Sequence, residues 1–107
     1  MVDILKGKAL EDFEKWYIKF IGLKYLSYKE YYINRFLDKH PSEQYGVLED
    51  WFDSVEDKTE VRILPKISRG WKCYFTEIKG ITDKHNTRNE ARMEAIKKAV
   101  ETYNKLA

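Results

Sequence analysis

Two arginines four residues apart carry the clearest chemical signal in this sequence. Arg88 and Arg92 lie in TRNEARMEAIKKAVETYNKL, residues 87–106, and positions i and i+4 share one face of a helix. Thr87 and Glu90 have capping-box spacing, which starts that helix just before Arg88. Two cations near the positive end of a helix dipole favour an anion such as phosphate. We therefore predict Arg88 and Arg92 as phosphate contacts, the alternative being a solvated helix face.

A second group of basic residues lies on a predicted β-hairpin, whose side chains alternate between two faces. The face predicted for the core carries Val61, Ile63, Ile67, Trp71, Cys73 and Phe75. The opposite face carries Arg62, Leu64, Lys66, Lys72, Tyr74 and Thr76. A basic face with a tyrosine suits nucleic acid, because bases stack on the ring of Tyr74 while Arg62, Lys66 and Lys72 neutralise phosphates. The alternative is that a further helix covers Leu64, Tyr74 and Ile78.

The middle of the chain is acidic. Residues 41–57 hold six Asp and Glu side chains and no Lys or Arg, whereas residues 58–107 hold 12 basic and 6 acidic side chains. Such a separation serves either an external charged partner or pairing of the two regions within the fold, and both remain open. Asp50, Asp53 and Glu56 are the predicted protein-binding residues of this segment.

Tyrosines gather on a second candidate surface for a protein partner. Tyr25, Tyr28, Tyr31 and Tyr32 recur near Lys24 and Lys29. Tyrosines with this spacing form either a binding surface or a half-buried core.

The residue types needed for catalysis or metal binding do not converge. The chain has two histidines and one cysteine, Cys73, which excludes a zinc site of the usual spacing. A nucleophile motif and a Gly-rich phosphate loop are both missing from the sequence. We expect a protein that is not an enzyme, with no cofactor and no metal site, and with an inert core thiol at Cys73.

The elements that position these residues follow from the spacing of apolar side chains. A period of three to four residues predicts helices over residues 9–21, 27–37, 42–54 and 87–106. Between residues 61 and 81 the period changes to two, which predicts two strands joined by a turn at residues 68–70. Because a two-stranded ribbon alone is marginal, helices must cover at least one of its faces. The prediction is an α+β fold: three N-terminal helices, a β-hairpin and a long C-terminal helix packed as one small domain over residues 1–107.

The last helix resembles the second-helix motif of double-stranded RNA-binding domains, a Lys-Lys-x-Ala-Lys run that continues in alanines. The matching positions here are Arg88, Ala91, Arg92, Ala95 and Ala99. Asn89 stands where the family has its second Lys, and we predict two strands where the family has three. The resemblance implies that the basic residues reach phosphates across a groove of a duplex.

A broader resemblance covers about 60 residues. The block QYGVLEDWFDSV (residues 44–55), a hairpin and TRNEARMEAIKKAVETYN (residues 87–104) are similar to small uncharacterised proteins encoded by phages and prophages of gut bacteria. Those proteins share a Trp-Phe-Asp-Ser-Val block and a Thr-Arg-x-Glu-Ala-Arg helix. The resemblance implies a phage or mobile-element origin and a cytosolic setting, and it brings no assigned activity.

Location and function follow as expectations. No apolar run approaches the roughly 18 residues of a membrane span, and the N-terminus MVDILKGKALEDF lacks the apolar region of a signal peptide. We therefore expect a cytoplasmic protein without a membrane partner. The expected function is that of a phage-derived adapter or modulator that binds a host or phage protein. The alternative is a nucleic-acid-binding module that uses the basic hairpin and the start of the last helix.

Overall fold

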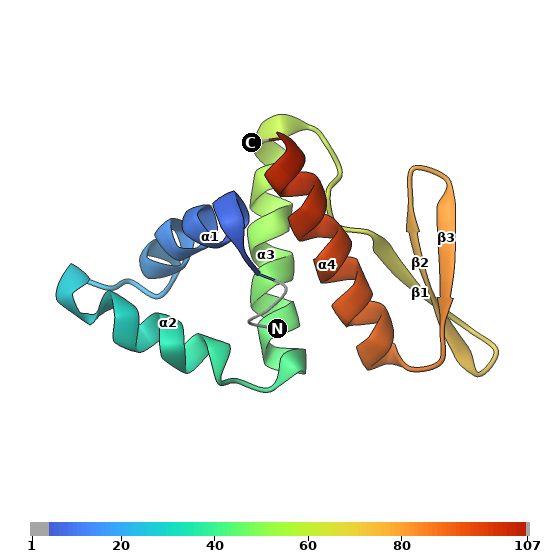
Figure 1. Cartoon of the computed structure of the whole chain (residues 1–107), viewed down its shortest axis with the longest axis horizontal. Helices are drawn as coiled ribbons and strands as arrows, with labels where there is room; N and C mark the ends of the chain where they lie inside the picture. The colour runs from blue at the N-terminus through green and yellow to red at the C-terminus, as the bar shows by residue number, and fades with distance from the viewer. Residues whose placement is uncertain (1–4, 107) are drawn as a thin grey trace.

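Residues 5–106 fold as four α-helices and a three-stranded antiparallel sheet (Figure 1). The computed structural model describes residues 5–106, so residues 1–4 and 107 of the predicted domain lie outside it. The elements are α1 (Gly7–Phe20), the 3-10 turn η1 (Leu26–Tyr28), α2 (Lys29–Leu37), α3 (Pro41–Thr59), β1 (Lys66–Gly70), β2 (Cys73–Ile78), β3 (Ile81–His85) and α4 (Arg88–Leu106). The predicted α+β class with a long C-terminal helix is confirmed.

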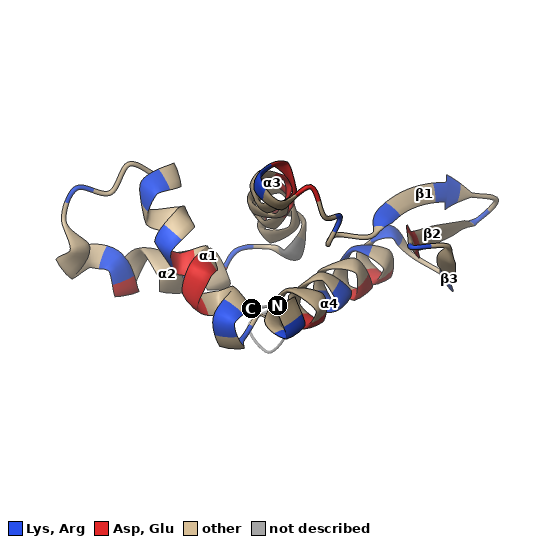
Figure 2. Ribbon diagram, turned by 90° about the horizontal axis from the view of Figure 1, so that it is seen from above, with Lys and Arg blue, Asp and Glu red and all other residues tan. Residues whose placement is uncertain are grey.

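The elements are arranged along a molecule 47 Å in its longest extent. Figures 1 and 2 agree that α1 and α2 lie at one end and the sheet at the other, with α3 and α4 between them. Helix α4 is the central element, because it contacts α1, α3 and all three strands. The small side chains of Ala91, Ala95 and Ala99 on its buried face allow this close packing on several sides. Surfaces carried by the two ends are therefore well separated.

Aromatic rings hold the helical end together. Phe13 of α1 is fully buried, and its ring centroid lies 5.0 Å from that of Phe36 on α2 and 5.5 Å from that of Trp51 on α3. Gln44 is also buried, and its Nε2 donates to the backbone oxygens of Phe36 and Leu37 at 3.1 and 2.9 Å. The Phe36 oxygen also accepts from the Lys39 N–H at 3.1 Å, so Gln44 adds a second bond there and satisfies the Leu37 oxygen at the end of α2.

Helix α3 continues to Thr59 rather than ending near Ser54 as predicted. It stops at Glu60, whose φ of 58° is left-handed. The side chain of Glu56 then turns back to the following loop, and its Oε1 accepts from the backbone N–H groups of Ile63 and Leu64 at 2.7 and 3.0 Å. The loop is thereby fixed to the last turn of α3, which sets where β1 begins.

The sheet has a third strand that the sequence prediction missed. Lys79 and Gly80 have φ values of 52° and 79°, and positive φ at both central residues is the mark of a tight type I′ hairpin turn. This turn divides the segment predicted as one strand and lets Ile81–His85 pair with β2 as β3. The predicted two-stranded hairpin is therefore wrong in its strand number.

The predicted assignment of the hairpin faces is also wrong on β2. Asp83 pairs with Lys98 of α4, and Thr76, which lies beside Asp83 in the register, is buried on the same side. Tyr74 and Thr76 thus face α4, whereas Cys73 and Phe75 occupy the opposite face. Cys73 is nevertheless buried, as predicted. The turn lies at residues 71–72 and not at 68–70, so Ile67 pairs with Thr76 rather than with Trp71. This shift is an odd number of residues, and it therefore moves every side chain of β2 to the other face.

Candidate binding surfaces

Arginines from α4 and β1 lie together beside the start of α4, and the two from α4 lie over tyrosine rings. The guanidinium of Arg88 lies 5.5 Å from the ring centroid of Tyr74 on β2, and that of Arg92 lies 5.3 Å from the ring centroid of Tyr45 on α3. Arg69 of β1 lines the same hollow of about 270 Å³, which we call the arginine cluster. Its remaining lining residues are Glu49, Ile67 and Ser68. Three arginines against one carboxylate leave the cluster positively charged.

Within residues 5–106, the side-chain hydrogen bonds and ion pairs leave the N–H donors of this cluster's arginines free. The ion pairs among the described residues all use lysine. Burial and the neighbouring Glu49 raise the pKa of Tyr45 to about 12, so Arg92 lies over a neutral ring. A guanidinium stacked on an aromatic face still presents the N–H groups at its edge to an anion. The cluster can therefore bind phosphate oxygens in several directions.

The backbone at the start of α4 contributes less than the sequence suggests. Thr87 caps the helix, because its Oγ1 accepts from the Glu90 N–H at 3.1 Å. Glu90 Oε2 accepts from the N–H of Asn86 at 3.2 Å, one residue before the position that a capping box uses. These bonds occupy donors of the helix N-terminus and place a carboxylate beside it. Anion binding there depends on the arginine side chains.

The other predicted nucleic-acid contacts lie apart from the cluster. Arg62 and Lys66 line a neighbouring hollow together with Glu49, Asp53 and Glu56, so acidic side chains surround them. Lys72 lies in the β1–β2 turn, with its Nζ 5.6 Å from the ring centroid of the adjacent tryptophan. Of the six predicted contacts, the structure brings together Tyr74, Arg88 and Arg92. It adds Arg69 and Tyr45, which the sequence prediction missed.

The predicted acidic surface on α3 is only partly free. Asp50 and Asp53 are exposed, whereas Glu56 is half-buried and accepts the two backbone bonds described above. Burial, followed by the charges of Glu56, Asp50 and Asp57, raises the pKa of Asp53, and Arg62 opposes that shift. The acidic middle and the basic loop thus face each other in part, as one sequence alternative anticipated. In Figure 2 red and blue segments meet where α3 leads toward β1.

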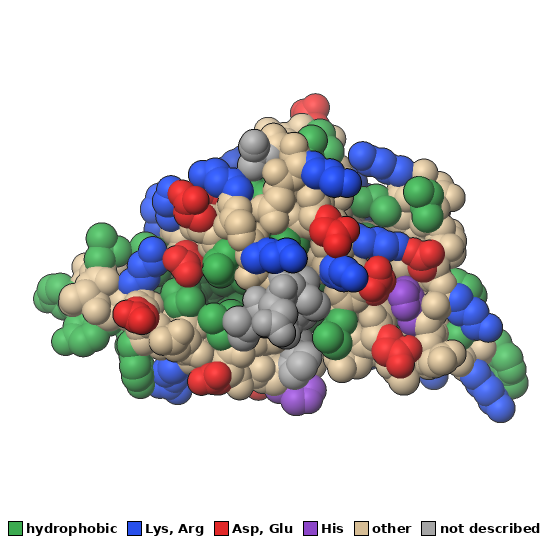
Figure 3. Space-filling view, viewed as in Figure 1, with side chains coloured by type: hydrophobic (Ala, Val, Ile, Leu, Met, Phe, Trp, Pro, Cys, Tyr) green, Lys and Arg blue, Asp and Glu red, His purple; other side chains and the backbone are tan. Residues whose placement is uncertain are grey.

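The largest exposed aromatic surface lies at the opposite end of the molecule. Seven large apolar side chains between residues 20 and 32 are exposed: Phe20, Ile21, Tyr25, Leu26, Tyr28, Tyr31 and Tyr32. Figure 3 shows apolar side chains gathered over this end, around the connection from α1 to α2. Of the two sequence alternatives for the tyrosines, the structure supports an exposed surface, because Tyr25 and Tyr28 are 67% and 56% exposed.

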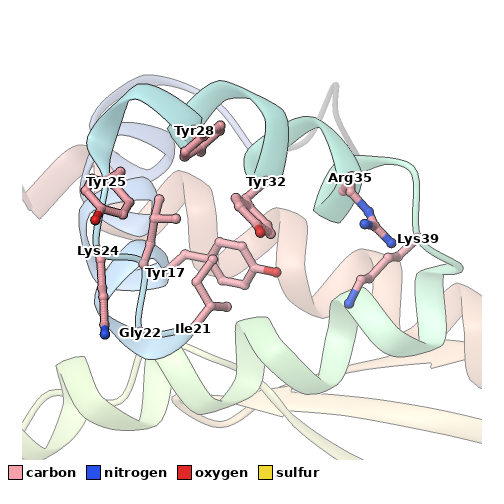
Figure 4. Close-up of a pocket in the computed structure, with 10 residues that line it drawn as sticks. Tyr17, Ile21, Gly22, Lys24, Tyr25, Tyr28, Tyr32, Arg35 and Lys39 are labelled. Atoms are coloured by element: carbon pink, nitrogen blue, oxygen red, sulfur yellow. The ribbon is translucent and has the colours of Figure 1, made fainter.

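A groove runs through this surface between α1 and α2 (Figure 4). It has a volume of about 570 Å³ and is lined by Tyr17, Ile21, Gly22, Leu23, Lys24, Tyr25, Tyr28, Tyr32, Arg35 and Lys39. We call it the tyrosine groove. In Figure 4 Lys24 lies at one end and Arg35 and Lys39 at the other, with tyrosine rings between them. The lining therefore combines three cations and four tyrosines, and it includes no carboxylate.

Arg35 is held in place at its end of the groove. Its Nη1 donates to the hydroxyl of Tyr31 at 3.2 Å, and its guanidinium lies 5.7 Å from that ring's centroid. Burial raises the pKa of Tyr17 at the groove floor, and the charge of Arg35 opposes the shift. Tyr17 is thus a neutral, amphipathic floor beneath a positively charged rim.

The described residues contain no group of three or more His, Cys, Asp or Glu side chains that could hold a metal ion. His40 Nδ1 lies 2.8 Å from Ser42 Oγ at the start of α3, and His85 Nε2 lies 3.0 Å from Thr76 Oγ1 inside the sheet. Both histidines thus have structural partners. The helices of this part of the chain include none that is long and apolar enough to cross a membrane.

Comparison with protein-family models, curated proteins and solved structures finds no match to this chain. The three strands remove one difference from double-stranded RNA-binding domains, yet that resemblance and the one to phage proteins stay predictions. The candidate functional surfaces are therefore the tyrosine groove at the α1–α2 end and the arginine cluster beside the sheet.

Proposed function

We propose that this protein is a non-enzymatic adapter that binds an acidic segment of a partner protein, from a phage or its host, in the tyrosine groove. The observation that carries the proposal is the exposure of seven large apolar side chains between residues 20 and 32, four of which line the groove: Ile21, Tyr25, Tyr28 and Tyr32. Contiguous apolar surface of this kind marks interaction sites, and tyrosine is enriched in protein interfaces. Exposed Ile21 in the groove lining favours an apolar protein side chain over a nucleobase.

The charges of the groove favour an acidic occupant. Lys24, Arg35 and Lys39 stand at its two ends, and the lining offers no carboxylate to neutralise them. A segment with Glu or Asp flanking a large apolar side chain places its charges on these ends and its apolar group between the tyrosines. The acidic surface around Asp50 and Asp53 of α3 is the weaker candidate, because Arg62 and Lys66 line the same hollow as Asp53.

The test is a charge swap with two labelled peptides. One peptide alternates Glu with Leu and Phe, and its counterpart carries Lys in place of Glu. Both peptides have about 12 residues, which is long enough to span a groove of this size. Fluorescence anisotropy should show that the protein binds the acidic peptide. The Lys24→Glu, Lys39→Glu variant should bind it about tenfold more weakly, or about 1.4 kcal/mol, and should gain affinity for the basic peptide.

A matched control separates the groove from net charge. Lys97→Glu, Lys105→Glu makes the same change at two exposed positions of α4, and it should leave acidic-peptide binding within about twofold of the parent. Equal binding of both peptides by the unmodified protein would contradict the proposal. So would a control variant that loses as much affinity as the groove variant.

A further inference from the structure

The tip of the β1–β2 hairpin carries a large ring that packs on little of the fold. Trp71 is 86% exposed, more than any other large apolar side chain in the described chain. The ammonium of Lys72 lies 5.6 Å from its ring centroid. Figure 3 shows apolar and basic side chains side by side over this turn. An exposed indole ring costs solvation free energy, and stacking against a partner recovers it.

The arginine cluster lies directly behind this tip. Arg69 lines the cluster and precedes Trp71 by two residues, a distance of about 7 Å at the rise of a strand. Arg88 and Arg92 extend the cluster along one face of α4, with Cβ atoms about 6 Å apart at this spacing. Positive side chains with free donors therefore lead from the start of α4 to an exposed aromatic ring.

We propose that this surface binds single-stranded nucleic acid, with phosphates on Arg69, Arg88 and Arg92 and a base stacked on Trp71. Arginine fits phosphate because its N–H groups form a planar fork. Stacking on a ring at a hairpin tip requires an unpaired base, which a single strand offers and a duplex does not. The base-stacking residue is thus Trp71 rather than Tyr74, which faces α4 beneath Arg88.

This site is independent of the proposed adapter surface. The sheet and the α1–α2 groove lie at opposite ends of the molecule (Figure 1). Variants of one surface leave the other intact, so each proposal can fail alone.

The test uses labelled oligonucleotides and tryptophan fluorescence. Anisotropy is measured with an oligothymidylate of about 15 nucleotides and a DNA duplex of the same length, at about 50 and 200 mM salt. Arg88→Gln, Arg92→Gln should weaken single-strand binding at least tenfold and lower the salt slope by about 1.4, since each phosphate contact contributes about 0.7. Trp71→Ala should weaken binding about tenfold and remove the fluorescence quenching that stacking produces.

Two control variants separate the loss of phosphate contacts from the loss of net charge and from unfolding. Lys97→Gln, Lys105→Gln removes the same charge elsewhere on α4 and should change affinity by less than about twofold. Arg88→Lys, Arg92→Lys keeps the charge, and it should retain part of the affinity if the first variant lost phosphate contacts rather than its fold. The absence of binding at the lower salt would overturn the proposal. So would tighter binding of the duplex that Trp71→Ala leaves unchanged. A loss of affinity in the Lys97→Gln, Lys105→Gln variant equal to that in the Arg88→Gln, Arg92→Gln variant would also overturn it.

Discussion

Replacing Glu56 with alanine should destabilise the fold strongly and leave both binding surfaces unaltered. Its Oε1 accepts from the N–H groups of Ile63 and Leu64 at 2.7 and 3.0 Å. Those residues are only 2% and 4% exposed, so water replaces the carboxylate poorly. A buried amide left without an acceptor costs about 1–3 kcal/mol, so two such amides give a loss of about 2–6 kcal/mol.

Urea unfolding followed by circular dichroism measures this loss. The matched control is Asp57→Ala, which removes the same charge from the next, exposed position and should cost less than about 0.5 kcal/mol. Glu56→Gln keeps an acceptor oxygen without its charge and should fall between the two variants. Equal unfolding midpoints for Glu56→Ala and Asp57→Ala would refute the structural role of Glu56 and return it to the candidate protein-binding residues.

Three further predictions concern the core, the hairpin and pH. Phe13→Ala, at a fully buried ring, should cost about 3–5 kcal/mol in urea unfolding, and a loss below about 1 kcal/mol would contradict the packing described. Gly70→Ala would place a Cβ 2.5 Å from the ring of Phe75, so it should cost about 1–3 kcal/mol and speed hydrogen exchange in β1 and β2; unchanged exchange would count against the register. The hydroxyl of Tyr103 donates to Asp12 at 2.5 Å and lowers the pKa of that carboxyl from its ordinary value. Because the folded-state pKa is depressed, this stabilisation is present above about pH 4 and is lost as pH falls through the folded value. In the Tyr103→Phe variant, the free energy of unfolding should therefore fall less steeply as the pH is lowered below about 4. An unchanged pH dependence would contradict the pairing of Tyr103 with Asp12.

Helix positions could be predicted from the sequence because long apolar periodicities are strong local signals. The structure has helices in all four predicted regions, with α3 extended to Thr59. The third strand was missed because Ile81–His85 carries mainly polar residues, and its pairing depends on the positive φ of Lys79 and Gly80. A lysine gives little sign of that conformation, since non-Gly residues rarely adopt it.

The candidate site could be predicted in part. The arginines Arg88 and Arg92 were found because a capping box fixes where α4 begins. Arg69 and Trp71 were missed because the predicted turn was placed too early, which put one residue in the turn and the other in the core. The register depends on the pairing of whole strands, and this pairing cannot be predicted from the spacing of residues along one strand.

The central claim is that an acidic segment binds in the tyrosine groove, and an amide NMR titration tests it most directly. The Glu, Leu and Phe peptide is added to isotope-labelled protein, and the shifted amides are placed on the structure. We predict that the shifts concentrate in residues 17–39, around Tyr25, Tyr28 and Arg35. Shifts centred on Arg69, Arg88 and Arg92 instead, or none at millimolar peptide, would contradict the account.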